Sequence, residues 1–448
     1  MASKEQASIV ICGAGIAGIA TAYWLSVVHR QSGILIVDPM APMSLTSAAS
    51  GENYRSWWPQ EELAEFADRS ITLMHELAGD DGGNFRISQT GYAYVTRSPD
   101  TDAIVAGIER VYGHGKAGEI RVHEEARDIP HATDGTDILL NAKAIRDRYP
   151  HLTPDIRAMT LVRRAGDIDS QQLGQFMLAE AKAHGVRVAP LQVGAISDLG
   201  GKFEIDATSA TGPRRIETDV LVNAAGPFAK SVAAMLGADL PLECIYQQKI
   251  AFEDKRGIVP RTAPFTIDQD AGPLDWPDDV RALLREDPET APLADDQPGG
   301  VHVRPEGGEK SRWVKLGWAT NKTPEPPVQH PAGSDTFPEI VMRGAARLVP
   351  GLAAYCDDLP RNLSHYGGYY TRTPENWPLI GPMGPDGAFM IAGLSGYGTM
   401  MACAAAELCA AWITGSDLPA VAQKFSLAHY GDEELMRRIA GADTDGEL

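Results

Sequence analysis

Three glycines near the start of the chain have the spacing of a phosphate-binding turn. Gly13, Gly15 and Gly18 follow the pattern G-x-G-x-x-G, and Asp38 stands 20 residues after the last of them. In such a turn the first glycine permits a tight bend, the second lets backbone approach a pyrophosphate, and the third lets helix and strand pack closely. A carboxylate at the later position can hold ribose hydroxyls. The pattern predicts a bound dinucleotide, either a nicotinamide coenzyme or a flavin.

The segments around these glycines supply the elements that such a site needs. Residues 8–12 are a short apolar run typical of a buried parallel strand, 16–28 have apolar residues at helical spacing, and 34–37 predict a second strand. The glycines therefore lie at a strand-to-helix turn, where N–H groups and the helix dipole favour a phosphate. The small and hydroxyl residues after Asp38 could lie against a long cofactor, or could form an ordinary polar surface loop.

Two distant segments repeat this arrangement. An apolar strand is predicted at 219–223 and runs into Ala224, Ala225 and Gly226, whose small side chains let backbone approach a ligand. Nearer the C-terminus, a strand at 388–392, a glycine-rich turn at 393–398 and a small-residue helix at 399–413 follow one another. The N-terminus of that last helix would favour negative charge, such as the N1/C2 carbonyl edge of a reduced flavin.

The glycine-rich turn shares part of the pattern of a hydrolase nucleophile elbow. Residues 393–397 place Ser395 at a strand-to-helix turn, as the pattern G-x-S-x-G does. Tyr397 stands where that pattern needs its last glycine, so a hydrolase is disfavoured.

Composition narrows the classes of function. The chain has 448 residues, 44% hydrophobic and 22% charged, which is typical of a globular protein with two or three domains. A formal net charge of -20 without any Lys/Arg run argues against nucleic acid as a partner. Five scattered cysteines predict reduced thiols and a cytoplasmic location. We expect no secretory signal, because the first strand begins within ten residues, and no transmembrane segment or metal site.

Further motifs extend the pattern along nearly the whole chain. They are Gly166-Asp167-Ile168-Asp169 before a helix, Val222-Asn223-Ala224-Ala225-Gly226-Pro227, Thr373-Pro374-Glu375, and Pro378-Leu379-Ile380-Gly381 before the last glycine turn. In this order they resemble the D-amino acid oxidase/sarcosine oxidase superfamily of flavoproteins. The resemblance implies FAD rather than NAD, in a discontinuous Rossmann-like α/β domain of the glutathione-reductase type with an inserted β-sheet-rich substrate domain. The expected FAD domain is 1–90, 155–245 and 365–440, and the substrate domain is 91–154 and 246–364.

The resemblance also implies where the cofactor lies. Adenine would lie near Val193, the pyrophosphate on the first glycine turn, and the isoalloxazine between 50–55 and 393–399. The expected cofactor-binding residues are Gly13, Ala14, Gly15, Ile16, Ala17, Gly18, Asp38, Pro39, Ser47, Ser50, Gly51, Asn53, Val193, Ala224, Ala225, Gly226, Gly393, Leu394, Ser395, Gly396, Tyr397, Gly398 and Thr399. Gly368 takes the place of a flavin-linking cysteine, and 44–58 contain no histidine, so FAD should be bound without a covalent link.

The chemistry implied by the resemblance is oxidation of an amine or amino acid by hydride transfer to flavin N5, with an imine that water hydrolyses. Met400 replaces a lysine that binds substrate carboxylate in several relatives, which leaves Arg55, Arg304 or Arg372 as substitutes. Aromatic residues are dense around the expected site and favour a secondary, N-substituted or bulky amine. These aromatics are Trp57, Trp58, Tyr246, Tyr366, Tyr369, Tyr370 and Tyr397. The alternatives are a 2-hydroxy-acid or glycerol phosphate dehydrogenase of this fold, and a flavin-binding subunit without turnover.

Four residues are expected to have catalytic roles, namely Lys315, Arg55, Tyr369 and Tyr397. Strand alternation in 313–317 puts Trp313, Lys315 and Gly317 on one face, and the segment resembles a strand whose lysine lies beside flavin N5 in sarcosine oxidase-like enzymes. The ammonium would then assist electron transfer to oxygen, with an electron carrier as the alternative acceptor. Equally, Lys315 could extend to solvent from an edge strand.

Overall fold

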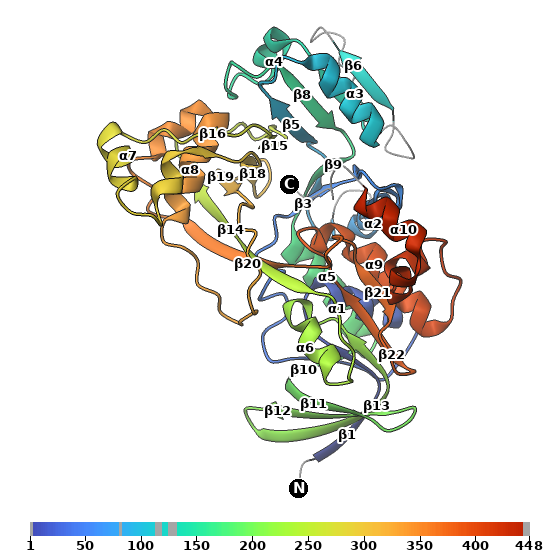
Figure 1. The fold of residues 1–448 in the computed structure, drawn as a ribbon. Helices are drawn as coiled ribbons and strands as arrows, with labels where there is room; N and C mark the ends of the chain where they lie inside the picture. Colours follow the sequence, from blue (N-terminus) through green and yellow to red (C-terminus); the bar gives the residue numbers. More distant parts are fainter. Residues whose placement is uncertain (1–2, 80–82, 113–118, 124–131, 442–448) are drawn as a thin grey trace.

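Two large β-sheets organise the chain, as seen in a computed structural model that describes residues 3–79, 83–112, 119–123 and 132–441. One sheet has eight strands and the other has nine. Figure 1 shows the eight-stranded sheet in the lower half, and the long strands β14 (Glu243–Glu253) and β20 (Ser364–Arg372) running up toward the other strands of the nine-stranded sheet. The predicted α/β class, with a second domain rich in strands, is confirmed.

The eight-stranded sheet has the order β10-β2-β1-β13-β12-β11, with β22 on β13 and β21 on β22. Its strands are β1 (Ser3–Cys12), β2 (Ile34–Asp38), β10 (Arg187–Pro190), β11 (Gln192–Asp198), β12 (Phe203–Ser209), β13 (Gly212–Asn223), β21 (Leu379–Pro382) and β22 (Ala388–Ala392). The pairs β10·β2, β2·β1, β1·β13 and β13·β22 are parallel. The carboxyl ends of β1, β2, β13 and β22 therefore meet at one edge, where a doubly wound sheet binds ligands.

Most local predictions in this sheet agree with the structure, and two strands are longer than predicted. β1 begins at Ser3 rather than Ser8, because its polar first half pairs with residues 214–218 of β13. β13 likewise starts at Gly212, since its first half forms a hairpin with β12 that exposes many polar side chains. The predicted helix 16–28 is α1 (Ile16–Tyr23) followed by a π-helical turn over Trp24–Val28.

Four helices pack together in one core beside the sheet: α1, α2 (Glu61–Ala78), α5 (Ser170–Ala183) and α9 (Gly398–Thr414). The alanine-rich α9 contacts both α1 and α2, because small side chains let helices approach closely. It ends at Gly415, whose φ of 67° is left-handed. The opposite core of the sheet includes α6 (Ala229–Ala234).

The nine-stranded sheet has the order β20-β14-β19-β18-β15-β5-β8-β7-β6. Besides β14 and β20 it contains β5 (Tyr92–Thr96), β6 (Ile120–His123), β7 (Thr136–Leu139), β8 (Ala158–Val162), β15 (Phe265–Asp268), β18 (His302–Glu306) and β19 (Trp313–Gly317). The helices that accompany it are α3 (Thr101–Tyr112), α4 (Ala142–Arg148), α7 (Asp278–Leu284) and α8 (Phe337–Leu348), while α10 (Glu433–Ala440) lies near α2 and α9 (Figure 1). The amphipathic α8 buries its apolar face in this second core.

Smaller elements join the two large sheets. A three-stranded sheet has the order β3-β9-β4, with β3 (Asn53–Arg55), β9 (Ala165–Ile168) and β4 (Ile87–Ser88), and β16 (Gly272–Pro273) pairs with β17 (Asp296–Gln297). β8 and β20 belong to the nine-stranded sheet, although 158–162 and most of 364–372 fall in the predicted FAD-domain ranges. The exact domain boundaries therefore stay a prediction.

Three properties of the described residues bear on function. None of their helices is both long and apolar enough to cross a membrane. They contain no group of three or more His, Cys, Asp or Glu side chains that could hold a metal ion. All five cysteines are unpaired, and burial raises the thiol pKa of Cys12, Cys403 and Cys409 to about 12.

Candidate active site

The glycine turn between β1 and α1 has the geometry that its spacing predicts. Gly13 has a φ of 114°, and a Cβ there would overlap the carbonyl of Ala224 at the end of β13. A Cβ on Gly18 would overlap the carbonyl of Gly13, so helix and turn are in direct backbone contact. Gly15 differs from both, because its Cβ would meet only the Ser47 hydroxyl, at 3.2 Å. Gly13 and Gly18 thus allow close packing, and Gly15 leaves backbone open to a ligand.

Hydrogen bonds hold the polar groups around this turn. Asp38 Oδ2 accepts the N–H of Ala14 at 2.7 Å, and its Oδ1 accepts the N–H of Met40 at 2.8 Å. Ser47 Oγ accepts the N–H of Ile16 at 3.0 Å, in the first turn of α1. The carboxylate and the hydroxyl are therefore fixed beside a helix N-terminus before any ligand binds.

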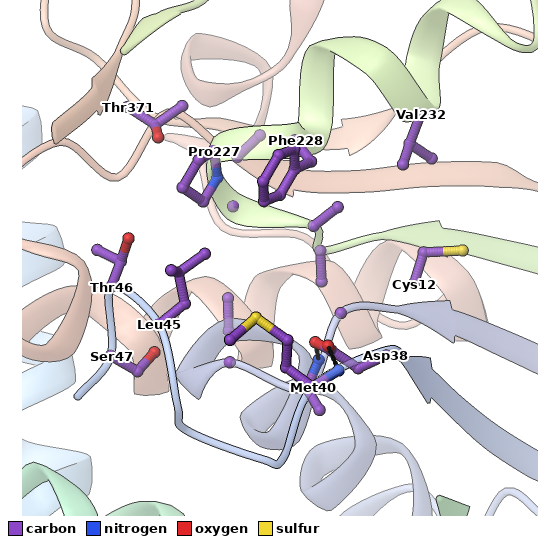
Figure 2. A pocket seen from close by; sticks show the side chains of 18 of the residues that line it. Cys12, Asp38, Met40, Leu45, Thr46, Ser47, Pro227, Phe228, Val232 and Thr371 are labelled. Carbon is purple, nitrogen blue, oxygen red and sulfur yellow. Dashed lines mark hydrogen bonds between the residues drawn. The ribbon is translucent and has the colours of Figure 1, made fainter. Parts of the chain in front are cut away.

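A cavity of about 440 Å³ extends from this turn along the edge where the parallel strands end. Figure 2 shows Asp38 and Met40 on one side of it, Thr46 and Ser47 on the loop that follows, and Pro227 and Phe228 facing them. Sixteen of the predicted cofactor-binding residues line this cavity: Gly13, Ala14, Gly15, Ile16, Ala17, Asp38, Pro39, Ser47, Val193, Ala224, Ala225, Gly226, Gly393, Leu394, Ser395 and Gly398. Segments nearly 400 residues apart thus form one wall.

The other predicted cofactor-binding residues lie outside the cavity lining. They are Gly18, Ser50, Gly51, Asn53, Gly396, Tyr397 and Thr399. Ser50 and Thr399 share a hydrogen bond of 2.9 Å between their hydroxyls, which ties the loop after β2 to the first turn of α9. A Cβ on Gly396 would lie 2.6 Å from the ring of Tyr370 in β20. Ser50, Thr399 and Gly396 therefore lie where the α9 end of the cavity meets the nine-stranded sheet, whereas Gly18 packs against the first glycine turn.

Sequence reasoning missed part of the lining. Leu45 and Thr46 on the loop after β2, Phe228 after β13, Gln329 from the predicted substrate domain, and Thr371 of β20 were not among the predicted residues. Thr46 was detectable in principle as a hydroxyl in the small-residue run, and its Oγ1 is buried without a hydrogen-bond partner in the described structure. The cavity wall thus combines open glycine backbone, the anchored Asp38 carboxylate, the buried Thr46 hydroxyl and the N-terminus of α9. These groups fit a dinucleotide.

Lys315 lies inside the nine-stranded sheet and is only 6% exposed. The alternative of an edge-strand lysine that reaches solvent is therefore wrong, since β19 is flanked by β14 and β18. Its Nζ lies 2.7 Å from Glu52 Oε2 and 3.0 Å from Glu306 Oε2, and 3.4 Å from the Ser50 carbonyl oxygen. Burial lowers the Lys315 pKa, but the carboxylates contribute to a net rise.

Arg304 shares the carboxylates of Lys315 and is 2% exposed. Its Nη2 lies 2.5 Å from Glu306 Oε2 and 3.3 Å from Glu52 Oε2, and donates to the Gly51 carbonyl at 2.9 Å. Burial acts to raise the pKa of Glu52, yet Lys315 and Arg304 lower it to about 2. Two buried cations and two carboxylates therefore hold the 50–52 loop against β18 and β19.

The other predicted polar candidates are in different surroundings. Arg55 is buried, with its guanidinium carbon 4.5 Å from the ring centre of Trp58, and its Nε donates to the Trp57 carbonyl at 3.2 Å. Arg372 Nε lies 3.5 Å from a Glu243 carboxylate oxygen. Met400 is 2% exposed in α9. The structure does not bring Arg55 or Arg372 to the cavity wall.

The two tyrosines with predicted catalytic roles use their hydroxyls elsewhere. Tyr369 lines the cavity, and its hydroxyl accepts the N–H of Val328 at 3.1 Å. The Tyr397 hydroxyl donates to the Asn376 carbonyl at 2.6 Å, and its ring packs edge-on against Trp58 at 4.9 Å. Neither contact brings them to Lys315, so their catalytic roles stay predictions.

The three predicted tyrosines of β20 divide between its two faces. Tyr369 packs on Tyr246 of β14 with ring centres 5.4 Å apart, together with Cys244. Tyr366 and Tyr370 alternate with Tyr369 along β20 and therefore project from the opposite face. Lys249 of β14, which sequence reasoning missed, lies directly opposite Tyr366, and its Nζ is 5.5 Å from the ring centre of Tyr370.

Comparison with known proteins bears out the fold and FAD as the cofactor. The sequence profile of the family "FAD dependent oxidoreductase" (DAO) matches residues 8–412. Among curated proteins, the mitochondrial dimethylglycine dehydrogenase of Rattus norvegicus is 22% identical over 434 residues, which cover 93% of this chain and 44% of that protein. The chain therefore spans less than half the length of this relative.

Several solved structures have a fold similar to that of this chain over almost their whole length. L-proline dehydrogenase from P. horikoshii has a TM-score of 0.72 at 18% identity, over 96% of this chain and 99% of that one. Glycine oxidase from Geobacillus kaustophilus has a TM-score of 0.71 at 15% identity, over 94% and 98%. L-α-glycerophosphate oxidase from Mycoplasma pneumoniae, solved with FAD bound, has a TM-score of 0.68 at 15% identity, over 92% and 95%. At these identities the likeness shows the fold alone.

Proposed function

The chain belongs to the DAO family of FAD-dependent oxidoreductases, and from this premise we propose that it oxidises the C–N bond of an amine or amino acid. A secondary, N-substituted or bulky amine is the preferred substrate. FAD, when bound, supplies the hydride acceptor at N5. The imine product then takes up water and separates into a carbonyl compound and an amine.

One observation supports this proposal: the 50–52 loop lies between the first turn of α9 and the nine-stranded sheet. Ser50 is hydrogen-bonded to Thr399 at the start of α9, while Lys315 and Arg304 donate to the carbonyls of Ser50 and Gly51. The sheet face that carries these cations therefore adjoins the flavin end of the expected FAD site. A substrate held on that face would lie beside the reacting part of the cofactor.

The side chains of this face suit an amine. Tyr366 and Tyr370 supply aromatic walls, which hold N-alkyl groups by apolar contact. The buried cation of Lys249, which the Glu52 and Glu306 carboxylates paired with Lys315 and Arg304 do not balance, disfavours a nearby ammonium and so favours the neutral amine, the form that can release a hydride. The residues thus contribute orientation and a choice of protonation state rather than an acid-base triad.

Oxidation of a hydroxy acid or of glycerol phosphate is the main alternative, and the fold alone does not separate it from amine oxidation. A phosphate ester carries nearly two negative charges and needs several free cations. Here Lys315 and Arg304 are already neutralised by Glu52 and Glu306. This pairing disfavours glycerol phosphate as the substrate.

The remaining assignments belong to the same proposal. FAD is bound without a covalent link, because Gly368 offers no thiol to attach it. A Cβ added at Gly368 would lie only 3.1 Å from the Ala49 side chain. Lys315 assists electron transfer to oxygen, with an electron carrier as the other acceptor. The unpaired cysteines support a reducing, cytoplasmic location.

Product analysis tests the proposed reaction. The purified holoenzyme is supplied with secondary amines, N-methyl amino acids, 2-hydroxy acids and glycerol phosphate, together with an artificial electron acceptor. We expect a carbonyl product and a released amine in equal amounts, one of each for two electrons accepted. Turnover of hydroxy acids or glycerol phosphate alone would support the alternative reaction, and electron transfer from none of them would indicate a flavin-binding subunit without turnover.

A further inference from the structure

The connection between β19 and α8, residues 319–336, contains neither helix nor strand, and we call it the strap. Loops longer than about 12–15 residues without secondary structure are uncommon in compact domains and usually have a function. Four prolines, at positions 324, 326, 327 and 331, restrict φ and keep the strap extended and stiff. Figure 1 shows it as the loop that descends beside β14 and β20 toward the eight-stranded sheet and then returns to α8.

The strap runs along a free edge of β14. β20 pairs with β14 over residues 243–251, whereas β19 pairs with it only over 249–253, so the first half of β14 lacks a strand on one side. The strap takes that place, and the N–H of Glu325 donates to the Cys244 carbonyl at 2.8 Å. A covering segment of this kind satisfies part of an open sheet edge. The path of the strap is therefore set by the nine-stranded sheet.

Two side chains anchor the strap on either side of its tip. Asn321 Nδ2 donates to the Tyr246 carbonyl at 3.0 Å, before the strap reaches the cofactor cavity. On the return, Gln248 Oε1 accepts the N–H of Ser334 at 2.7 Å. Neither Asn321 nor Gln248 is part of the described cavity lining. A change at these anchors therefore acts on the strap without altering the cavity wall.

The tip of the strap bridges the two large sheets at the cavity. The N–H of Val328 donates to the hydroxyl of Tyr369 in β20 at 3.1 Å, and Gln329 Nε2 donates to Oε1 of Gln192 in β11 at 3.3 Å. Gln329, Tyr369 and Gln192 all line the cavity, and Val193, where adenine is expected, follows Gln192 directly. A dinucleotide in this cavity would lie beneath the bridge.

The tip is held weakly for a segment in this position. Two hydrogen bonds join residues 327–331 to the rest of the described structure, and Val328 is 50% exposed. A hydrogen bond contributes little net stability, because water replaces it when it opens. Segments with few buried apolar contacts open locally at a small part of the cost of global unfolding. The tip can therefore lift while both sheets stay folded.

We propose that the strap is a gate on the cofactor cavity, and that FAD enters and leaves when the tip lifts away from Tyr369 and Gln192. Gln329 closes the gate, while Asn321 and Gln248 are positioning residues that hold the strap in its closed path. This inference goes beyond the proposed oxidation and requires only that FAD occupies the cavity. It is therefore tested without any amine substrate.

The rates of FAD exchange report on the gate. Holoenzyme that contains isotopically labelled FAD is incubated with excess unlabelled FAD, and mass spectrometry measures the label that the protein retains over time. Uptake is followed as the change in flavin fluorescence when apoenzyme is mixed with FAD. In Asn321→Ala/Gln248→Ala, release and uptake should both become at least about fivefold faster, because the lost hydrogen bonds favour the open strap. The dissociation constant should stay within about twofold, since opening affects both rates alike.

A cross-link tests the gate in the opposite direction. Gln192→Cys/Gln329→Cys places thiols on the two side chains that meet at the tip, and a short bismaleimide joins them after FAD has bound. The joined protein should release FAD at least about tenfold more slowly than the same variant before joining, because the open strap is no longer accessible. Apoenzyme that is joined first should take up FAD more slowly in the same way. The parent treated with the reagent is the control for reaction of its own cysteines, of which only Cys356 is not buried.

Lys322→Ala is the matched control for the anchors, because it changes an exposed side chain of the same strap and should leave both rates unchanged. Exchange rates that are equal in the parent and Asn321→Ala/Gln248→Ala would overturn the inference, and so would a joined protein that releases FAD as fast as before. A weaker dissociation constant with unchanged uptake would also overturn it, since the anchors would then support binding or the fold rather than a gate. If the double variant does not fold, the cross-linked pair decides alone. Failure of the proposed oxidation would leave these rates unaffected.

Discussion

Gly15 is the residue whose side-chain size matters most directly for cofactor binding. Its backbone faces the cavity and its missing Cβ leaves space beside Ser47, whereas Gly13 and Gly18 face other backbone. A substitution at Gly13 or Gly18 would disturb the fold as well as the site, because the added atom overlaps a carbonyl. Gly15 therefore separates binding from folding better than its neighbours do.

Gly15→Val should give a folded protein that contains at least about tenfold less FAD, because the side chain occupies the path by which backbone reaches the pyrophosphate. The measurement is the ratio of flavin absorbance to protein absorbance after purification, with circular dichroism to establish folding. Gly194→Val is the control, since a Cβ there meets nothing nearer than 3.6 Å. A yellow Gly15→Val protein would contradict this placement of the pyrophosphate.

Lys315 is the residue at which the choice of electron acceptor can be tested. Lys315→Met should slow reoxidation of the reduced enzyme by oxygen by at least about tenfold, roughly 1.4 kcal/mol of barrier, because a buried positive charge near the site is lost. Anaerobic reduction by substrate should change less. Stopped-flow mixing with oxygen measures the rate, and Lys315→Arg, which keeps the charge, should restore most of it.

Equal reoxidation rates in the parent and Lys315→Met would assign Lys315 to structure alone, as a partner for Glu52 and Glu306. Slow reoxidation of the parent itself would identify a dehydrogenase that passes electrons to a carrier.

The 50–52 loop is the element that connects the cofactor site with the nine-stranded sheet, and Glu52 is its anchor. Glu52 Oε1 accepts from the backbone and hydroxyl of Ser170 at the start of α5, at 3.0 and 2.9 Å, while Oε2 faces Lys315 and Arg304. One carboxylate thus joins α5, β18 and β19. Its loss would leave buried cations without a full set of partners.

Glu52→Gln should lower the free energy of unfolding at neutral pH by about 3 kcal/mol, the scale for breaking a buried ion pair. The Glu52 pKa is about 2 in the folded protein against an ordinary 4.5, so its contribution is complete above pH 4.5 and lost as pH falls toward 2. The difference between parent and variant should therefore shrink over that range. Urea denaturation at several pH values measures it, with exposed Glu309→Gln as control; a difference independent of pH would contradict the ion pairing.

Elements defined by local sequence were predicted well. β22 and the turn before α9 were recognised from a short apolar run and a glycine cluster, and the first glycine turn has the roles expected for each glycine. The pairing of distant strands was not predictable in the same way. Lys249 and Lys315 are 66 residues apart, and only the register of β14 against β19 puts them on one face.

The partners of Lys315 show the same limit. Its strand and the face that it shares with Trp313 and Gly317 followed from alternation, but the position of β19 inside the sheet did not. Glu52 lies in the run of small and hydroxyl residues after Asp38, and its contact with Lys315 spans 263 positions of the chain. The charge of a buried site therefore depends on tertiary contacts that a single sequence does not reveal.

At the scale of the whole molecule, the cavity proposed to hold FAD is lined by segments from both ends of the chain. Such a site can hold FAD firmly through many weak contacts without a covalent bond. We expect heat or acid precipitation to leave a yellow supernatant with one FAD for each chain. Colour retained in the pellet would contradict non-covalent binding and would indicate a covalent link from FAD to a residue other than Gly368.

The central claim, oxidation of a C–N bond by this FAD-dependent enzyme, is tested most directly by an anaerobic titration. The holoenzyme is mixed without oxygen with N-methyl α-amino acids and, separately, with the 2-hydroxy acids of the same carbon skeleton, while the flavin bands are recorded. The account predicts bleaching by the N-methyl amino acids and no bleaching by the hydroxy acids. Bleaching by the hydroxy acids alone, with the N-methyl amino acids inert, would contradict it.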